Sequence, residues 1–155
     1  MRQPKTDIAG LLVKTLRGGA RVAFLPADID RRFARDNLPD HGDLLGNIIR
    51  WISKDKMPFE ISGPGLIDCH LYQQSGRLIL HLVNLTNTGT WRQPVDELIP
   101  VGPLKVRIKV SAEISGHEAR FLVADRSVPT KSIADWRQFT IPSIRDHEVV
   151  VIGKS

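Results

Sequence analysis

The sequence has little of what secreted, disulfide-bonded and membrane proteins depend on. It holds a single cysteine, Cys69, so no disulfide forms within the chain, as is usual in a reducing compartment. No apolar run approaches the roughly 20 residues that cross a bilayer, so we expect no membrane contact. Met1 to Gly10 is polar and includes a proline, which argues against a signal peptide. A cytoplasmic location is the default expectation.

The sequence also lacks a basic stripe of the kind that nucleic-acid-binding proteins present. The formal net charge is +5 and the pI about 9.7, but acidic residues are interspersed with the basic ones and aromatic residues make up only 6%. A surface that tracks phosphates usually combines charge of one sign with interleaved aromatics, so we expect no nucleic-acid partner. No internal repeat is visible, and no Ser or Cys occupies a nucleophile elbow. We expect no cofactor.

The first part of the chain predicts a hairpin followed by a helix. In residues 8–25, apolar residues lie on both sides of Gly18-Gly19. This Gly-Gly pair suits a two-residue turn, which would place Val13 opposite Phe24. A polar loop follows from Pro26 to Pro39, with a short helical turn near Asp30. Leucines and isoleucines then recur at helical spacing up to about Ser53, and Asp40 is the expected N-cap.

The polar loop is the first candidate site, because ligands of α/β units collect where strands lead into such loops. Retaining glycosidases need two carboxyls about 5–5.5 Å apart, and inverting ones about 6.5–9.5 Å. The interspersed arginines keep carboxylates ionised, which suits ion pairs better than a general acid, so we expect no catalytic residue in this chain. The residues that form the candidate polar or sugar-facing loop are Asp28, Asp30, Arg31, Arg32, Asp40 and His41.

From Phe59 onward the segments are short, β-rich and separated by turns, which is typical of an antiparallel sandwich. The predicted fold class is therefore α+β: a partial α/β unit (hairpin plus helix) in residues 1–57, then an antiparallel β-sandwich in residues 58–155. The hairpin and helix are too few to make a layered domain, so we expect them to pack on other domains or on another copy. Seven strands are predicted, at 59–62, 67–73, 78–85, 104–110, 118–124, 136–141 and 148–152.

A polar cluster is predicted on two neighbouring strands of this sandwich. If Ser75-Gly76 is a two-residue turn, His70 lies directly opposite His81, and Asp68 lies on the same face. Cross-strand neighbours have Cβ atoms about 4.5–5.5 Å apart, which makes these three residues weak candidates for a metal site. The alternative is a polar patch, and because the spacing is not distinctive we expect no metal.

Three aromatic residues are candidates for stacking on sugar rings: Trp91 in the long connection after residue 84, Trp136, and Tyr72. The alternative for each is packing in a core or an interface, which large aromatics dominate. Trp91 is the main candidate for an aromatic sugar contact.

The segment GGARVAFLPADIDRRFARDNLPDHGDLLGNIIRW resembles the end of the amidotransferase-like trimerisation domain of β-galactosidase-type glycoside hydrolases. The resemblance is carried by the strand that ends in Pro-Ala-Asp and by Leu44, Leu45, Asn47 and Trp51. The segment from Gly63 to Pro103 is similar to the β-sandwich that closes such proteins. In that family the catalytic acid and nucleophile lie in an amino-terminal TIM barrel, and the amidotransferase-like domain is a scaffold.

The resemblance implies a non-catalytic region of a glycoside-hydrolase-like protein that supports architecture or oligomer assembly and contacts carbohydrate. The expected partners are a second copy, the amino-terminal domains of a larger protein, and carbohydrate. Two alternatives stay open: a stand-alone carbohydrate-binding module, and a small metal-dependent hydrolase that uses Asp68, His70 and His81.

Overall fold

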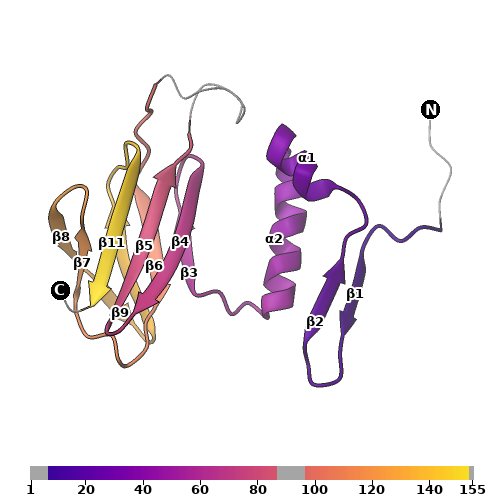
Figure 1. The fold of residues 1–155 in the computed structure, drawn as a ribbon, viewed down its shortest axis with the longest axis horizontal. Helices are drawn as coiled ribbons and strands as arrows, with labels where there is room; N and C mark the ends of the chain where they lie inside the picture. The colour runs from indigo at the N-terminus through magenta and orange to yellow at the C-terminus, as the bar shows by residue number, and fades with distance from the viewer. Residues whose placement is uncertain (1–6, 87–96, 154–155) are drawn as a thin grey trace. The chain divides into compact units, whose positions relative to one another are not determined.

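A computed structural model describes residues 7–86 and 97–153 and has an α+β fold. The chain divides into two compact units, Met1–Met57 and Pro58–Ser155 (Figure 1). The predicted fold class is confirmed, since a hairpin and helices precede an antiparallel β-sandwich. Within the described ranges, no helix is both long and apolar enough to cross a membrane.

Residues 7–57, the described part of the N-terminal unit, form two strands and two helices. The predicted helical turn near Asp30 is confirmed as α1. The predicted N-cap at Asp40 is wrong: the cap is Leu38, because Pro39 takes the first helical position, where its fixed φ and missing N–H cost nothing. Asp40 lies in the first turn, where its charge favours the helix dipole. The elements are β1 (Leu12–Thr15), β2 (Arg21–Phe24), α1 (Ile29–Asp36) and α2 (Pro39–Ser53).

The hairpin differs from its prediction by one residue in register. Leu12 pairs with Phe24 and Val13 with Ala23, where we predicted Val13 opposite Phe24. The cause is a three-residue loop closed between Leu16 and Ala20, rather than a two-residue Gly-Gly turn. Because side chains alternate along a strand, a shift of one residue changes which side chains share a face.

The face of β2 toward α2 carries a charged residue and a small apolar one. Arg21 and Ala23 are half-buried, while Val22 and Phe24 are exposed. Arg21 donates a hydrogen bond from Nη1 to the carbonyl of Trp51, 2.7 Å away, and its guanidinium lies 5.1 Å from the centre of that indole ring. An arginine and a tryptophan thus connect the strand to the helix.

The C-terminal unit is a sandwich of two antiparallel sheets that face each other (Figure 1). The four-stranded sheet has the order β3-β6-β10-β9, and the five-stranded sheet has the order β4-β5-β11-β7-β8. The first sheet consists of β3 (Phe59–Ser62), β6 (Leu104–Lys109), β10 (Trp136–Ile141) and β9 (Lys131–Ile133). The second consists of β4 (Ile67–Gln74), β5 (Arg77–Asn84), β11 (His147–Gly153), β7 (Glu118–Phe121) and β8 (Arg126–Pro129).

Alternate residues of the inner strands fill the space between the sheets. Leu80 and Leu82 of β5 and Phe121 of β7 face Val106 of β6 and Ile141 of β10 across the core, and all five are buried. Buried residues alternate with exposed or partly exposed ones along β6 and β7, which gives each strand one buried face and one accessible face. Each predicted strand is present, and β5 lies inside its sheet, between β4 and β11. Strands β8 and β9 were not predicted.

Candidate functional site

The charged segment between β2 and α2 forms the surface of two helices rather than an enclosed site. Arg31 pairs with Asp28 at 3.6 Å, and Arg32 pairs with Asp36 at 3.7 Å. Arg35 donates from Nε to Asp36 Oδ1 at 2.7 Å, and this hydrogen bond is the main cause of a lowered pKa of the Asp36 carboxyl. A carboxyl held ionised in this way accepts hydrogen bonds and does not act as an acid.

The other residues predicted for this segment are spread along it. Asp30 lies in the first turn of α1, and Asp40 and His41 lie in the first turn of α2. His41 is half-buried, and its Nδ1 has no hydrogen-bond partner among the described residues. Among the described residues, no network of hydrogen bonds or ion pairs joins all six predicted residues, so a sugar-facing role for this segment remains a prediction.

The register predicted for β4 and β5 is confirmed. Gln74 pairs with Arg77, and His70 lies directly opposite His81 on the outer face of the five-stranded sheet. Asp68 Oδ2 lies 3.2 Å from His70 Nε2, which orients that imidazole. Across the described parts of the chain, no three His, Cys, Asp or Glu side chains are grouped so that they would hold a metal ion.

Tyr72 lies beside the two imidazoles, and together the rings of His70, His81 and Tyr72 form a strip of aromatic side chains. Its ring centre lies 6.5 Å from that of His70, with near-parallel planes, and 5.5 Å from that of His81, edge to face. The tyrosine is 55% exposed, so one face of the strip is accessible to a ligand. Trp91, the main aromatic candidate from the sequence, lies outside the described residues.

Trp136 lies on the outer face of the four-stranded sheet and is partly exposed. The guanidinium carbon of Arg107 lies 4.6 Å from the centre of its ring, and Lys109 Nζ lies 5.0 Å away. Arg107 also donates from Nη1 to Glu60 Oε2 at 2.8 Å. Sequence reasoning named Trp136 but missed the cations around it. The sequence LKVRIK of β6 could have indicated them, because its basic residues alternate with apolar ones and therefore share one face of the strand.

We name this surface the Trp136 face. Three rows of paired residues cross it. One row joins Ser62, Lys105 and Thr140; the next joins Glu60, Arg107, Gln138 and Lys131; the third joins Lys109, Trp136 and Ile133.

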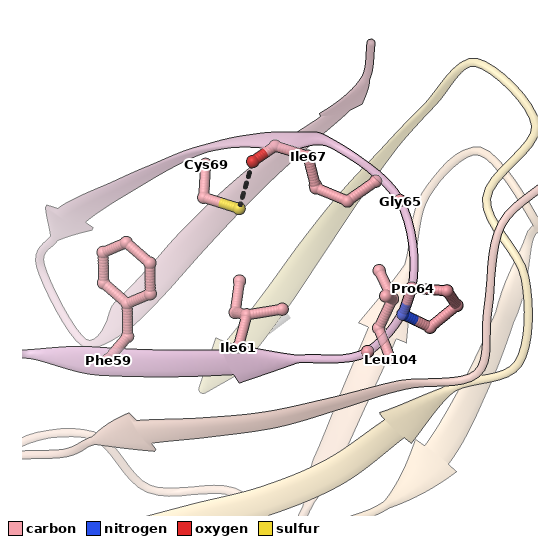
Figure 2. Close-up of a pocket in the computed structure, with 8 residues that line it drawn as sticks. Phe59, Ile61, Pro64, Gly65, Ile67, Cys69 and Leu104 are labelled. Atoms are coloured by element: carbon pink, nitrogen blue, oxygen red, sulfur yellow. Dashed lines mark hydrogen bonds between the residues drawn. The ribbon is translucent and has the colours of Figure 1, made fainter. Parts of the chain in front are cut away.

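The sandwich has a hollow of about 250 Å³ beside its edge strands β3 and β4. Figure 2 shows its apolar lining, to which Phe59, Ile61 and Ile67 contribute. Cys69 lies at its wall, with Sγ 3.7 Å from the carbonyl of Ile67, and burial raises the pKa of its thiol to about 11. The thiol is therefore protonated at neutral pH and is not a nucleophile.

A second hollow, of about 540 Å³, has charged residues and a histidine in its lining: Arg77, His117, Glu118 and Arg120. Its volume falls in the range of small-molecule sites. In the described part of the chain, these four side chains form no hydrogen bond with one another, and Arg77 instead donates to Gln74 at 2.8 Å. The hollow therefore has charged residues in its lining, but these side chains do not converge on a common point as they would in a binding site.

Comparison with known proteins gives a likeness of fold. No protein-family model matches the sequence, and the search of curated proteins found no match. Among solved structures, the chain is similar to alpha-L-fucosidase isoenzyme 2 from Paenibacillus thiaminolyticus, with a TM-score of 0.66 and 14% identity over 86% of this chain. A cycloisomaltooligosaccharide glucanotransferase from Paenibacillus sp. matches with a TM-score of 0.48 and 16% identity, over 61% of this chain and 16% of its own.

The chain spans about a fifth of the fucosidase, 21% of its length. The sandwich unit makes up less than two thirds of the chain, so a match over 86% extends into the N-terminal unit. At this identity the likeness shows the fold alone. The chain shares its fold with a region of a glycoside hydrolase.

Proposed function

We propose that this chain is a non-catalytic region of a glycoside-hydrolase-like protein, where it supports architecture or oligomer assembly and contacts carbohydrate. The fold likeness to part of an alpha-L-fucosidase supports the first half of this proposal. The resemblance of residues 18–51 to the β-galactosidase type is the finer form of the same proposal.

The observation that carries the assembly role is the lack of a core in the N-terminal unit. None of the described residues from 7 to 57 is buried. Leu12 is 54% exposed and Phe24 is 59% exposed, and they form a cross-strand pair on one face of the hairpin. Apolar faces and open strand edges of this kind are typical of surfaces that pack on a partner. A second copy of the chain is the partner we propose.

The non-catalytic role is supported by the chemistry of the acidic residues. The carboxyls of the charged segment lie beside arginines on exposed helix surfaces, and Asp36 is held ionised. A glycosidase needs one carboxyl that keeps its proton until it reaches the leaving group. We propose that Asp28, Asp30, Arg31, Arg32, Asp40 and His41 instead face sugar or a neighbouring subunit.

Light scattering on the purified chain tests the assembly role. We expect a dimer or trimer, and we expect Phe24→Glu to give a monomer, because a charge on the exposed hairpin face opposes its burial. Tyr72→Glu is the matched control: an aromatic of similar exposure on the sandwich, whose replacement leaves the mass unchanged. A monomeric wild-type chain, or equal effects of both variants, would overturn the assembly role.

Assays with aryl fucosides and aryl galactosides test the non-catalytic role. We expect no turnover by the purified chain. Hydrolysis that survives purification to constant specific activity and is lost in Asp40→Asn would show a catalytic carboxyl in this chain.

A stand-alone carbohydrate-binding module is the second candidate, favoured by the accessible ring of Tyr72 and the partly exposed ring of Trp136. Titration of a monomeric chain with galactosides and polysaccharides, followed by tryptophan fluorescence, separates the two. Saturable binding by a monomer supports the module, and the absence of any saturable change removes it.

A further inference from the structure

The outer face of the four-stranded sheet combines an aromatic ring with cations from a neighbouring strand. Lys105, Arg107 and Lys109 of β6 alternate with buried residues, so all three project from the same side of the sheet. Trp136 of β10 pairs directly with Lys109. Successive outward side chains on one strand lie about 6.6–6.8 Å apart, so the three cations make a continuous row.

The row carries more positive charge than the acidic groups beside it neutralise. Glu60 forms the ion pair on this face, with Arg107 at 2.8 Å. In the described part of the chain, no ion pair is seen for Lys105, Lys109 or Lys131. Like charges at close spacing repel one another, and an anionic ligand relieves that repulsion.

Trp136 adds a recognition element that a basic row alone does not have. Its ring attracts Arg107 and Lys109 through cation–π contacts at 4.6 and 5.0 Å. Because the indole is still partly exposed, a flat apolar surface lies beside the cations. Gln138 and Thr140 follow Trp136 at alternate positions on the same strand, and their neutral side chains suit hydroxyl groups.

We propose that the Trp136 face binds an acidic polysaccharide, a sugar chain that carries carboxylates. A pyranose ring has an apolar face that stacks on the indole, carboxylates that pair with the lysines, and hydroxyls that reach Gln138 and Glu60. This inference rests on the proposed contact with carbohydrate and names its surface and substrate class.

Two other ligand classes fit the face less well. A neutral sugar leaves the row of lysines without a partner. Single nucleic-acid strands are usually held by several stacking aromatics, whereas Trp136 is the aromatic ring that the described residues place on this face.

Binding of the full chain to polygalacturonate, neutral galactan and poly(dT), measured by isothermal titration and affinity electrophoresis, tests the proposal. We expect polygalacturonate to bind at least tenfold more tightly than galactan or poly(dT), with an affinity that falls as salt rises. Equal or tighter binding of galactan or of poly(dT) would overturn the acidic-sugar class, and no binding of any of the three would overturn the site.

Variants on the two sheet faces locate the binding surface. We expect Lys105→Glu, an exposed substitution that spares the core, and Trp136→Ala each to weaken polygalacturonate binding about tenfold or more, with the circular dichroism of the fold retained. Arg126→Glu, an exposed cation of the five-stranded sheet, and Arg17→Glu, an exposed cation of the hairpin loop, are the matched controls and should bind as the wild type does. Equal losses in the controls would overturn the assignment to the Trp136 face.

The outcome is separable from the test of assembly. An oligomer that binds no polysaccharide overturns this inference and leaves the assembly role standing. A monomer that binds polygalacturonate through Trp136 supports this inference and overturns the assembly role.

Discussion

Glu148 shows how a single side chain decides where a strand ends. It is 3% exposed, and its Oε1 and Oε2 accept hydrogen bonds from the backbone N–H groups of Val123 and Ala124, at 2.9 and 3.1 Å. The sequence pattern predicts a strand that continues to Ala124, but β7 ends at Phe121. The carboxylate of a distant strand satisfies the N–H groups that would otherwise seek a ladder partner, so the chain is free to turn into β8.

Cys69 is a residue whose reactivity the fold suppresses. Burial is the main cause that raises the pKa of its thiol from the ordinary 9.0 to about 11, and the charge of Asp68 adds to it. At pH 8 the fraction of thiolate, the reactive form, should be about a hundredfold lower in the folded chain than in the unfolded one. We expect Ellman's reagent to react correspondingly slowly until urea is added. Equal rates with and without urea would contradict the burial of this thiol.

The same shift gives a pH dependence of stability. The folded-state pKa lies above the unfolded one, so the contribution of Cys69 is fully present below pH 9.0 and falls as the pH rises toward about 11. We expect Cys69→Ala to show a smaller loss of stability than the wild type over that range.

At the scale of elements, two glycines of α2 have opposite roles. A Cβ on Gly42 would lie 2.8 Å from Phe33 Cε2, so the glycine allows α1 to pack closely on α2. A Cβ on Gly46 would meet nothing within 4 Å. We expect Gly46→Ala to stabilise the helix by about 1 kcal/mol, because alanine has the higher helix propensity. We expect Gly42→Ala to lose this gain and to destabilise the unit by about 1–3 kcal/mol through overpacking.

Thermal unfolding followed by circular dichroism at 222 nm compares the two variants. Each variant serves as the control of the other, since both replace glycine by alanine in the same helix and share the same gain in helix propensity. Equal stabilisation by both alanines would show that Phe33 does not pack against Gly42.

At the scale of the whole molecule, the stability resides in the sandwich. The core consists of buried residues from Leu78 to Ile152, whereas no described residue of the N-terminal unit is buried. We expect a fragment of residues 58–155 to unfold cooperatively in urea, and a fragment of residues 1–57 to lack a cooperative transition when alone. Fluorescence and circular dichroism, measured on both fragments, report these transitions. A cooperative transition of the short fragment as a monomer would contradict a unit that depends on partners.

The sequence by itself determined those features of this protein that depend on local period and turn chemistry. The helical spacing of Leu44 to Ile52 predicted α2, and alternation predicted the strands of the sandwich. The Ser75-Gly76 turn predicted the pairing of His70 with His81, because a two-residue turn at a known position allows a single strand register.

Only the tertiary structure decided the hairpin register, the division of β7 from β8, and the Trp136 face. A loop of one extra residue moved Leu12 opposite Phe24, and no local pattern distinguishes the two loop lengths. The Trp136 face joins Glu60 of β3, Arg107 of β6 and Trp136 of β10, three strands that neighbour each other in the sheet but not in the chain. Pairing between distant segments depends on how the whole core packs, so the basic row and its indole are separate in the sequence and become one surface in the fold.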